Sequence, residues 1–235
     1  MAVVLRNEGD YVGAHQMLSD AWISNSDFFR LQSDLSTFYV DLGMSDAAFA
    51  AATHTSTEGS VFALTGDMVE ARRLASLDPD EYAHAALISG EDELAYWIFR
   101  DEATQVDFAG DTRFGLNQAY FFAEMAYILG TQDDPDADQI LNKLEVLLTD
   151  HDPETFHQLG ALLAGTAVHL MRDRHEMAAE WLTVAIGRGH AIERINHHPM
   201  YAIVMADEAF KELVRQKSKN ARTWRVALDD ESIAN

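Results

Sequence analysis

The sequence contains no cysteine, which excludes disulfides, thiolate metal sites and a cysteine nucleophile. It has only four prolines in 235 residues, and strand-like alternation of β-branched residues is nearly absent. No apolar run reaches the roughly 18 residues that a membrane span needs. The first residues, MAVVLRNEGD, also lack the basic region and apolar core of a signal peptide. We therefore expect no membrane contact by this segment. We expect it to be soluble, in the cytoplasm, or in the periplasm if it belongs to a membrane-anchored regulator.

Basic residues are scarce. Lys and Arg total 17 against 39 Asp and Glu, which gives a formal net charge of -22, and the acids are spread along the chain. Such a charge repels phosphate backbones, so nucleic acid is not an expected partner of this segment. A basic region of another protein is electrostatically acceptable. High solubility, or adaptation to a salty habitat, would explain the same charge.

Helix-forming residues dominate what remains. Hydrophobic residues make up 48% of the chain, and Ala, Leu, Glu and Met recur at spacings of three and four, which predicts an all-α fold. Turn-forming positions divide this pattern at Gly9-Asp10, Gly43, Gly66-Asp67, Gly90, Gly130 and Asp173. An alanine follows five residues after each break except Gly130, where the next helix is expected to start at Pro135. This pattern predicts helical hairpins whose small alanines let the two backbones approach closely.

Two stretches resemble a known repeat family. GDYVGAHQMLSDAW at residues 9–22 is similar to the turn and second helix of a tetratricopeptide repeat, and Ala178, Leu182 and Ala185 match in the last repeat. The segment led by Pro199 resembles the capping end of repeat domains in bacterial adenylate cyclases and winged-helix regulators. The resemblance implies an α-α superhelix, a solenoid of helical hairpins with irregular, short repeats in the middle.

Three parts are expected on this basis. They are a repeat array at 1–198, a capping helical pair at 199–217, and a basic then acidic tail at 218–235. Since only half of a first helix precedes Gly9, we expect the chain to begin within a repeat and to be part of a larger protein.

In such a superhelix the first helix of each hairpin lines a concave face. Counting back from the breaks at Gly43 and Gly130 gives a polar and aromatic set that suits an extended or helical peptide. The expected peptide-binding residues are Arg30, Asp34, Thr37, Asp41, Asn117, Tyr120, Glu124 and Tyr127.

The most tempting metal-binding pattern runs from Asp134 to Glu145, where alternating carboxylates reproduce the ligand spacing of an EF-hand calcium loop. Gln139 stands where that loop needs glycine for its sharp turn. A helix start explains the pattern better, with Asp134 as N-cap and Pro135 in the first turn. We expect a helix there, and whether the segment binds calcium stays open.

No catalytic or cofactor motif is recognisable. The chain lacks the nucleophile elbow, the P-loop and the dinucleotide glycine fingerprint. The adjacent His197 and His198 are interpreted as surface-loop residues without a carboxylate to orient them. We therefore predict no enzymatic activity, no cofactor and no metal site, while a pair of carboxylates brought together from different helices stays possible.

The leading hypothesis is a non-catalytic scaffold that binds another protein, or another domain of the same chain, within a larger bacterial regulatory or signalling protein. The alternative is a helical enzyme or divalent-metal-binding protein whose site is formed by carboxylates from different helices. A third hypothesis is a homo-oligomer in which the basic stretch after Leu213 binds the acidic body of a second copy.

Overall fold

The computed structural model describes a chain built from helices, and the described residues contain no strand. The described residues are 11–24, 31–32, 35–36, 38–39, 44–52, 79–106, 115–116, 118–148, 151–156, 159–187, 195, 198–202, 204–208, 210–216, 219 and 223. The α-helices are α2 (Tyr11–Ser24), α4 (Ser45–Ala52), α7 (Pro79–Ile88), α8 (Asp92–Thr104), α9 (Ala119–Gly130), α10 (Asp136–Leu148), α11 (Leu159–Met171) and α12 (His175–Gly187). None of these helices is both long and apolar enough to cross a membrane.

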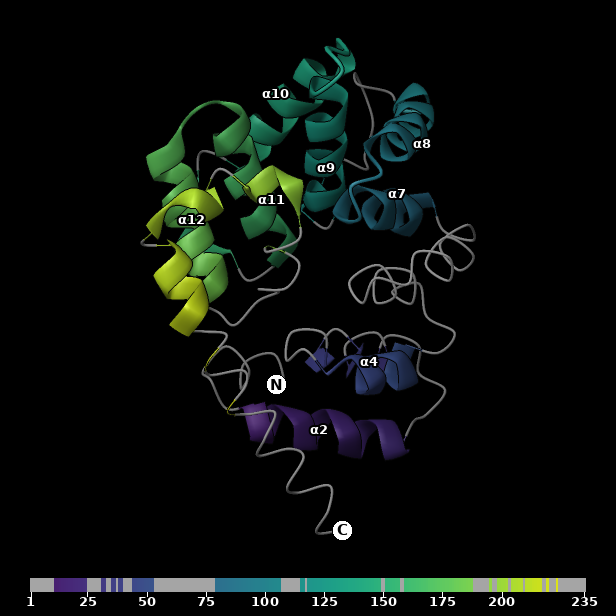
Figure 1. Cartoon of the computed structure of the whole chain (residues 1–235), viewed down its shortest axis with the longest axis vertical. Coiled ribbons are helices and arrows are strands. Elements are labelled where there is room, and N and C mark those ends of the chain that lie inside the picture. The colour runs from purple at the N-terminus through teal and green to yellow at the C-terminus, as the bar shows by residue number, and fades with distance from the viewer. Residues whose placement is uncertain are drawn as a thin grey trace.

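Helices α7 to α12 form three consecutive hairpins around one core, and α2 and α4 lie apart from them (Figure 1). Helix α9 occupies the middle, where it contacts α8, α10 and α11. The alanines expected after the breaks are fully buried where they are described, and Ala71 lies outside the described residues. The buried ones are Ala14, Ala48, Ala95 and Ala178. The all-α prediction is confirmed, and the superhelical arrangement stays a prediction.

The three hairpins share one turn geometry. Each turn places one residue in the left-handed region, at φ 72° for Gly90, 54° for Asp133 and 56° for Asp173. The following N–H then donates to a carbonyl five residues earlier, which satisfies a helix-end carbonyl. These bonds are Glu91 to Ala86 at 2.9 Å, Asp134 to Leu129 at 3.0 Å and Arg174 to His169 at 2.8 Å.

This geometry explains why the break at Gly130 departed from the sequence pattern. Gly130 is the last residue of α9, and the left-handed position is taken by Asp133 instead. Aspartate tolerates that conformation better than most side chains because its short polar group bonds locally. The turn is therefore longer, and α10 begins at Asp136.

Helix α11 packs closely on α12 at Gly165. The indole ring of Trp181 lies where a side chain at Gly165 would project, so a β-carbon there would overlap the ring. Trp181 is 2% exposed, and the adjacent rings of His169 and Phe156 lie 5.8 Å and 5.2 Å from it between centroids. Glycine at this position is thus required by packing.

We expect Gly165→Ala to lower the free energy of unfolding by about 1–3 kcal/mol, because overpacking forces Trp181 or the helix to move. Gly187→Ala is the matched control, since a β-carbon at that helical glycine meets nothing within 4 Å. Chemical denaturation of both variants measures the difference. Equal stability of the two variants would contradict this account of the α11–α12 contact.

The chain after α12 returns to the core and covers it. We define residues 198–216 as the closing segment. It contains the 3-10 turns η2 (Pro199–Tyr201) and η3 (Val204–Ala206) and helical residues at 210–216. Its apolar side chains join the main core, with Met200, Tyr201, Val204, Phe210 and Val214 all buried. Residues 218–235 lie almost entirely outside the described residues.

Candidate functional site

A buried carboxylate between two imidazoles lies at the centre of the helical core. Oε1 of Glu124 is 2.5 Å from Nδ1 of His84 and 2.9 Å from Nε2 of His198. His84 is 5% exposed, and Glu124 and His198 are each 2% exposed. We call these three residues the His-Glu-His cluster. A carboxylate buried this deeply requires hydrogen-bond donors, and the two imidazoles supply them.

Three segments far apart in sequence build the cluster. His84 lies on α7, Glu124 on α9, and His198 directly precedes Pro199 of η2. Helix α9 is apolar along almost its whole length, AYFFAEMAYILG, and Glu124 is the only charged residue in it. Its apolar faces drive the helix into the core, and the carboxylate is carried in with it.

Hydrogen bonding determines the tautomer of neutral His198. Its Nδ1 accepts the backbone N–H of Met200 at 3.2 Å, which caps η2. A nitrogen that accepts must be unprotonated, so the ring proton of neutral His198 is on Nε2 and points to Glu124. Burial lowers the pKa of His198 below 6.5, against the opposing attraction of the Glu124 carboxylate.

The carboxylate itself is ionised. Burial alone raises the pKa of Glu124, but the two imidazoles outweigh that effect and lower the pKa from 4.5 to about 2. His84 donates through Nδ1 to the same oxygen, and its Nε2 has no hydrogen-bond partner among the described residues. The cluster is thus an anion held between two donors.

The cluster is the one group of His, Asp and Glu residues in the described part of the chain whose donor atoms converge as metal ligands do. The separations observed are those of hydrogen bonds. Ligands at the roughly 2.1 Å typical of zinc would lie about 3.4 Å apart at tetrahedral angles, whereas the observed separations from Oε1 are 2.5 and 2.9 Å. Coordination through Nε2 of His198 would also require the proton on Nδ1, which here accepts from Met200.

Three tyrosines surround the cluster. Tyr120, Tyr127 and Tyr201 place their rings 6.1, 6.5 and 5.4 Å from the His198 ring. Burial, followed by the nearby Glu124 charge, raises the pKa of Tyr201 well above its ordinary value. Its hydroxyl therefore stays protonated and donates to the Leu163 carbonyl at 3.2 Å.

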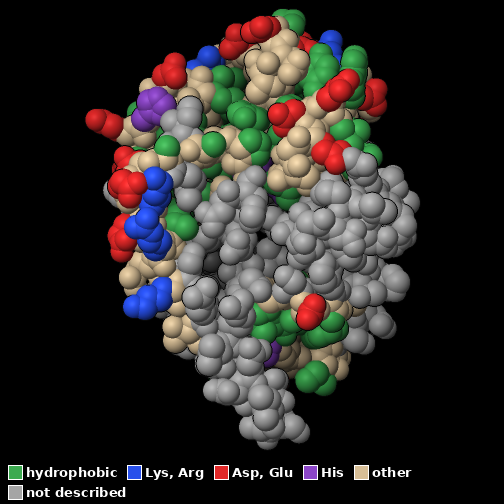
Figure 2. Space-filling model, in the orientation of Figure 1, with side chains coloured by type: hydrophobic (Ala, Val, Ile, Leu, Met, Phe, Trp, Pro, Cys, Tyr) green, Lys and Arg blue, Asp and Glu red, His purple; other side chains and the backbone are tan. Residues whose placement is uncertain are grey.

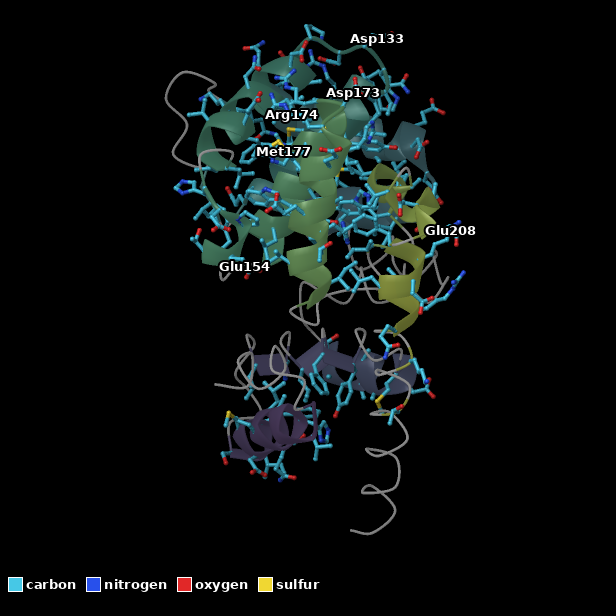
Figure 3. All side chains as sticks on the ribbon, turned by 90° about the vertical axis from the view of Figure 1, so that its left-hand side faces the viewer. Asp133, Glu154, Asp173, Arg174, Met177 and Glu208 are labelled. Atoms are coloured by element: carbon cyan, nitrogen blue, oxygen red, sulfur yellow. The ribbon has the colours of Figure 1, made fainter. Side chains whose placement is uncertain are left out.

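Tyr127 also lines an open pocket of about 480 Å³ at the end of the α9–α10 hairpin. The apolar lining includes Ala126, Leu141 and Met171, and exposed Asp133 and Asp138 lie at the same site. Figure 3 shows Asp133 at the same end of the molecule as Asp173, the corresponding residue of the next hairpin. We call this feature the hairpin-end pocket. It joins an apolar surface to carboxylates within one hollow.

The prediction that α10 starts with an N-cap is confirmed. Oδ1 of Asp134 accepts the backbone N–H of Asp136 at 3.0 Å. Arg100 of α8 then binds both carboxylates, at 3.2 Å from Asp134 and 2.5 Å from Asp136.

At the other end of the calcium-like pattern, Glu145 accepts from Arg172 and Arg174. The arginine bonds lower the pKa of Glu145. The carboxylates that matched calcium-loop spacing are therefore largely bound to arginines from other helices.

The structure describes three of the eight residues expected to bind a peptide. Tyr120 and Tyr127 are half-buried around the cluster, and Glu124 is buried within it. Peptide binding by these residues stays a prediction. The other five lie outside the described residues: Arg30, Asp34, Thr37, Asp41 and Asn117.

The interpretation of His198 as a surface-loop residue without a carboxylate partner is wrong. His198 is 2% exposed and bonds Glu124, 74 residues away. No motif in the sequence includes His84. The available signal was a lone charge in an apolar helix, since a buried Glu124 requires a partner. Nothing in the local sequence indicates which histidines would supply it.

No protein-family model matches the chain, and neither a curated protein nor a solved structure does. The tetratricopeptide resemblance therefore stays a prediction, and function has to be argued from the residues.

Proposed function

We propose that the protein is a non-catalytic binding module that takes a basic segment of another protein, or of another domain, at the hairpin-end pocket. The observation that carries the proposal is the combination of an apolar lining with carboxylates in one open pocket of about 480 Å³. Binding sites for side chains typically have this composition, an apolar hollow with a few polar groups that fix orientation.

Arginine and lysine side chains match the pocket chemically. Their apolar stems can cover Leu141 and Met171 while the charged head stays near carboxylates and water. Asp133 has no ion pair among the described residues. The Asp138 side chain is 80% exposed, and its one described ion pair, with Arg172, is 3.4 Å long. Both carboxylates are thus accessible to an incoming cation.

The surrounding charge favours the same partner. The whole chain carries -22, and Figure 2 shows acidic side chains over the upper part and the left edge of the visible face, with Lys and Arg side chains along that edge and a few at the top. Charge of this kind raises the association rate of a basic partner, and this increase becomes smaller as the salt concentration rises. A solenoid of stacked hairpins would extend the pocket into a longer groove, and this architecture forms part of the proposal.

The test uses fluorescein-labelled helical peptides of equal length that carry Arg, Lys, Gln or Glu at the same positions. We expect the Arg and Lys peptides to bind, measured by fluorescence anisotropy, and the others not to bind. Asp133→Asn with Asp138→Asn should weaken binding by about tenfold, equivalent to about 1.4 kcal/mol. Asparagine at position 133 tolerates the left-handed backbone.

The matched control changes the same charge elsewhere, through Glu176→Gln with Glu180→Gln on the exposed face of α12. Equal weakening by both double variants would show nonspecific attraction and would contradict a site at the pocket. The alternative function, a metal-binding or catalytic helical protein, would regain support from micromolar zinc or calcium binding measured by calorimetry.

A further inference from the structure

We propose that His198 is a pH-responsive latch, which holds the closing segment on the helical core when neutral and releases it when protonated. The inference stands apart from the proposed function, since it depends on the His-Glu-His cluster and not on the hairpin-end pocket. The deciding observation is that His198 makes one hydrogen bond through each ring nitrogen. Nε2 donates to Glu124, and Nδ1 accepts from Met200.

Protonation would break one of these bonds directly. Nδ1 of His198 accepts the N–H of Met200 at 3.2 Å. A proton on Nδ1 would set two N–H donors against each other at the start of η2, because a protonated imidazole donates from both nitrogens. The cap would be lost, and the desolvation of the charged ring outweighs its attraction to the Glu124 carboxylate at 2.9 Å. Both changes favour a state in which His198 moves into water.

The carboxylate that faces His198 and two of the facing tyrosines each keep one protonation state near neutral pH. Glu124 on α9 stays ionised far below neutral pH. Tyr127 on α9 and Tyr201 on η2 have pKa values raised by burial and remain neutral. The Tyr120 ring is tilted by 60° to the His198 ring, with the centroids 6.1 Å apart. His84 on α7 bonds Glu124 through Nδ1, and its Nε2 has no hydrogen-bond partner among the described residues. Of the two imidazoles, His198 is the one with a bond at each ring nitrogen, so an added proton breaks an existing bond.

The position of His198 makes it a suitable latch. It stands at the first residue of the closing segment, and its link to Glu124 joins that segment to α9. The adjacent Met200 and Tyr201 are 4% and 0% exposed, and Tyr201 bonds the Leu163 carbonyl of α11. When His198 leaves the core, we expect the adjacent Met200 and Tyr201 to leave their buried positions with it.

The sign of the pH effect follows from linkage. Burial lowers the pKa of His198 in the closed state below the 6.5 of a free imidazole. The open state therefore takes up the proton first. The equilibrium constant for opening should rise by up to tenfold for each pH unit below about 6.5, until the closed state also titrates.

Hydrogen exchange read by mass spectrometry tests the latch on the whole chain. After correction for intrinsic rates, peptides covering 199–216 should lose protection by about fivefold between pH 6.5 and pH 5.5, because the open state is already half protonated at pH 6.5. Peptides from α9 and α10 should lose less. A parallel loss in both regions would show global unfolding and would overturn the proposal.

Variants separate His198 from other histidines. In His198→Asn the amide oxygen can still cap η2, as asparagine does at helix starts, but the side chain does not titrate. The closing segment should then be less protected than in the wild type at pH 7.5, because the bond to Glu124 is lost, and should lose its fivefold pH dependence. His151→Asn, at an exposed histidine, should behave as the wild type. If protection of the closing segment still depends on pH in His198→Asn, the latch proposal is overturned.

A measurement on the unaltered protein covers the case in which His198→Asn fails to fold. Nitrogen-15 NMR of the imidazoles should show His198 as the Nε2–H tautomer at pH 7.5. Its protonation midpoint should coincide with the loss of protection at 199–216. An Nδ1–H tautomer, or midpoints that differ by more than one pH unit, would also overturn the proposal.

Discussion

Glu124→Leu should lower the free energy of unfolding by about 3–5 kcal/mol, the range measured when one partner of a buried ionic network is removed. Leucine fills a similar volume, so the loss comes mainly from hydrogen bonding. The Nδ1–H of His84 and the Nε2–H of His198 would both remain buried without an acceptor. Denaturation in urea, followed by circular dichroism at pH 7.5, measures the change.

Glu124→Gln provides the matched comparison, because its amide oxygen can accept from both imidazoles while the charge is removed. We expect it to cost about 1–2 kcal/mol, since charged hydrogen bonds are stronger than neutral ones by about that amount. Glu180→Gln, at an exposed position on α12, should change stability by less than about 0.5 kcal/mol. Similar losses for leucine and glutamine would show that the two donors find other partners.

His169→Leu should have the opposite sign and raise the free energy of unfolding by about 1–3 kcal/mol. His169 on α11 is 1% exposed, and neither of its ring nitrogens has a hydrogen-bond partner among the described residues. A buried polar group without a partner carries its full desolvation cost. Leucine removes that cost and can still pack on Trp181. Met171→Leu, a half-buried apolar change nearby, is the control for packing alone.

The same substitution should flatten the acid side of the stability profile. Burial, followed by the Arg174 charge, lowers the pKa of His169 below 6.5 in the folded protein. The unfolded chain therefore binds the proton first, and stability present above pH 6.5 is lost as pH falls. His169→Leu should reduce this slope by up to about 1.4 kcal/mol per pH unit. Unfolding midpoints between pH 7.5 and pH 5.0 test this. Lower stability of the variant at pH 7.5 would indicate that His169 has a bonding role.

Local features of the fold were predictable from sequence because their causes are local. The Asp134 cap of α10 and the stop of α11 at Asp173 each depend on a few neighbouring residues. Helix periodicity and the buried alanines follow from the same short-range rules. The later start of α10 after Gly130, expected at Pro135, is also local, since aspartate at 133 supplies a left-handed conformation usually assigned to glycine.

The His-Glu-His cluster was not predictable in this way. Its members are 40 and 74 residues from Glu124, and each lies in a stretch with a sufficient local explanation. Glu124 fits a polar groove and His198 fits a loop before proline. Only the packing of α7, α9 and η2 brings them together. The pocket has the same origin, since Met171 reaches it from a different hairpin.

Tyr127 is shared by the two features, because it lines the hairpin-end pocket and its ring meets His198 edge to face at 6.5 Å. Thermodynamic reciprocity applies to any such shared residue. If an occupant of the pocket shifts the Tyr127 ring, it changes the proton affinity of His198 by a certain factor. Protonation must then change the affinity of that occupant by the same factor. Under that condition, binding at the surface and proton uptake in the interior are two measurements of one coupling free energy.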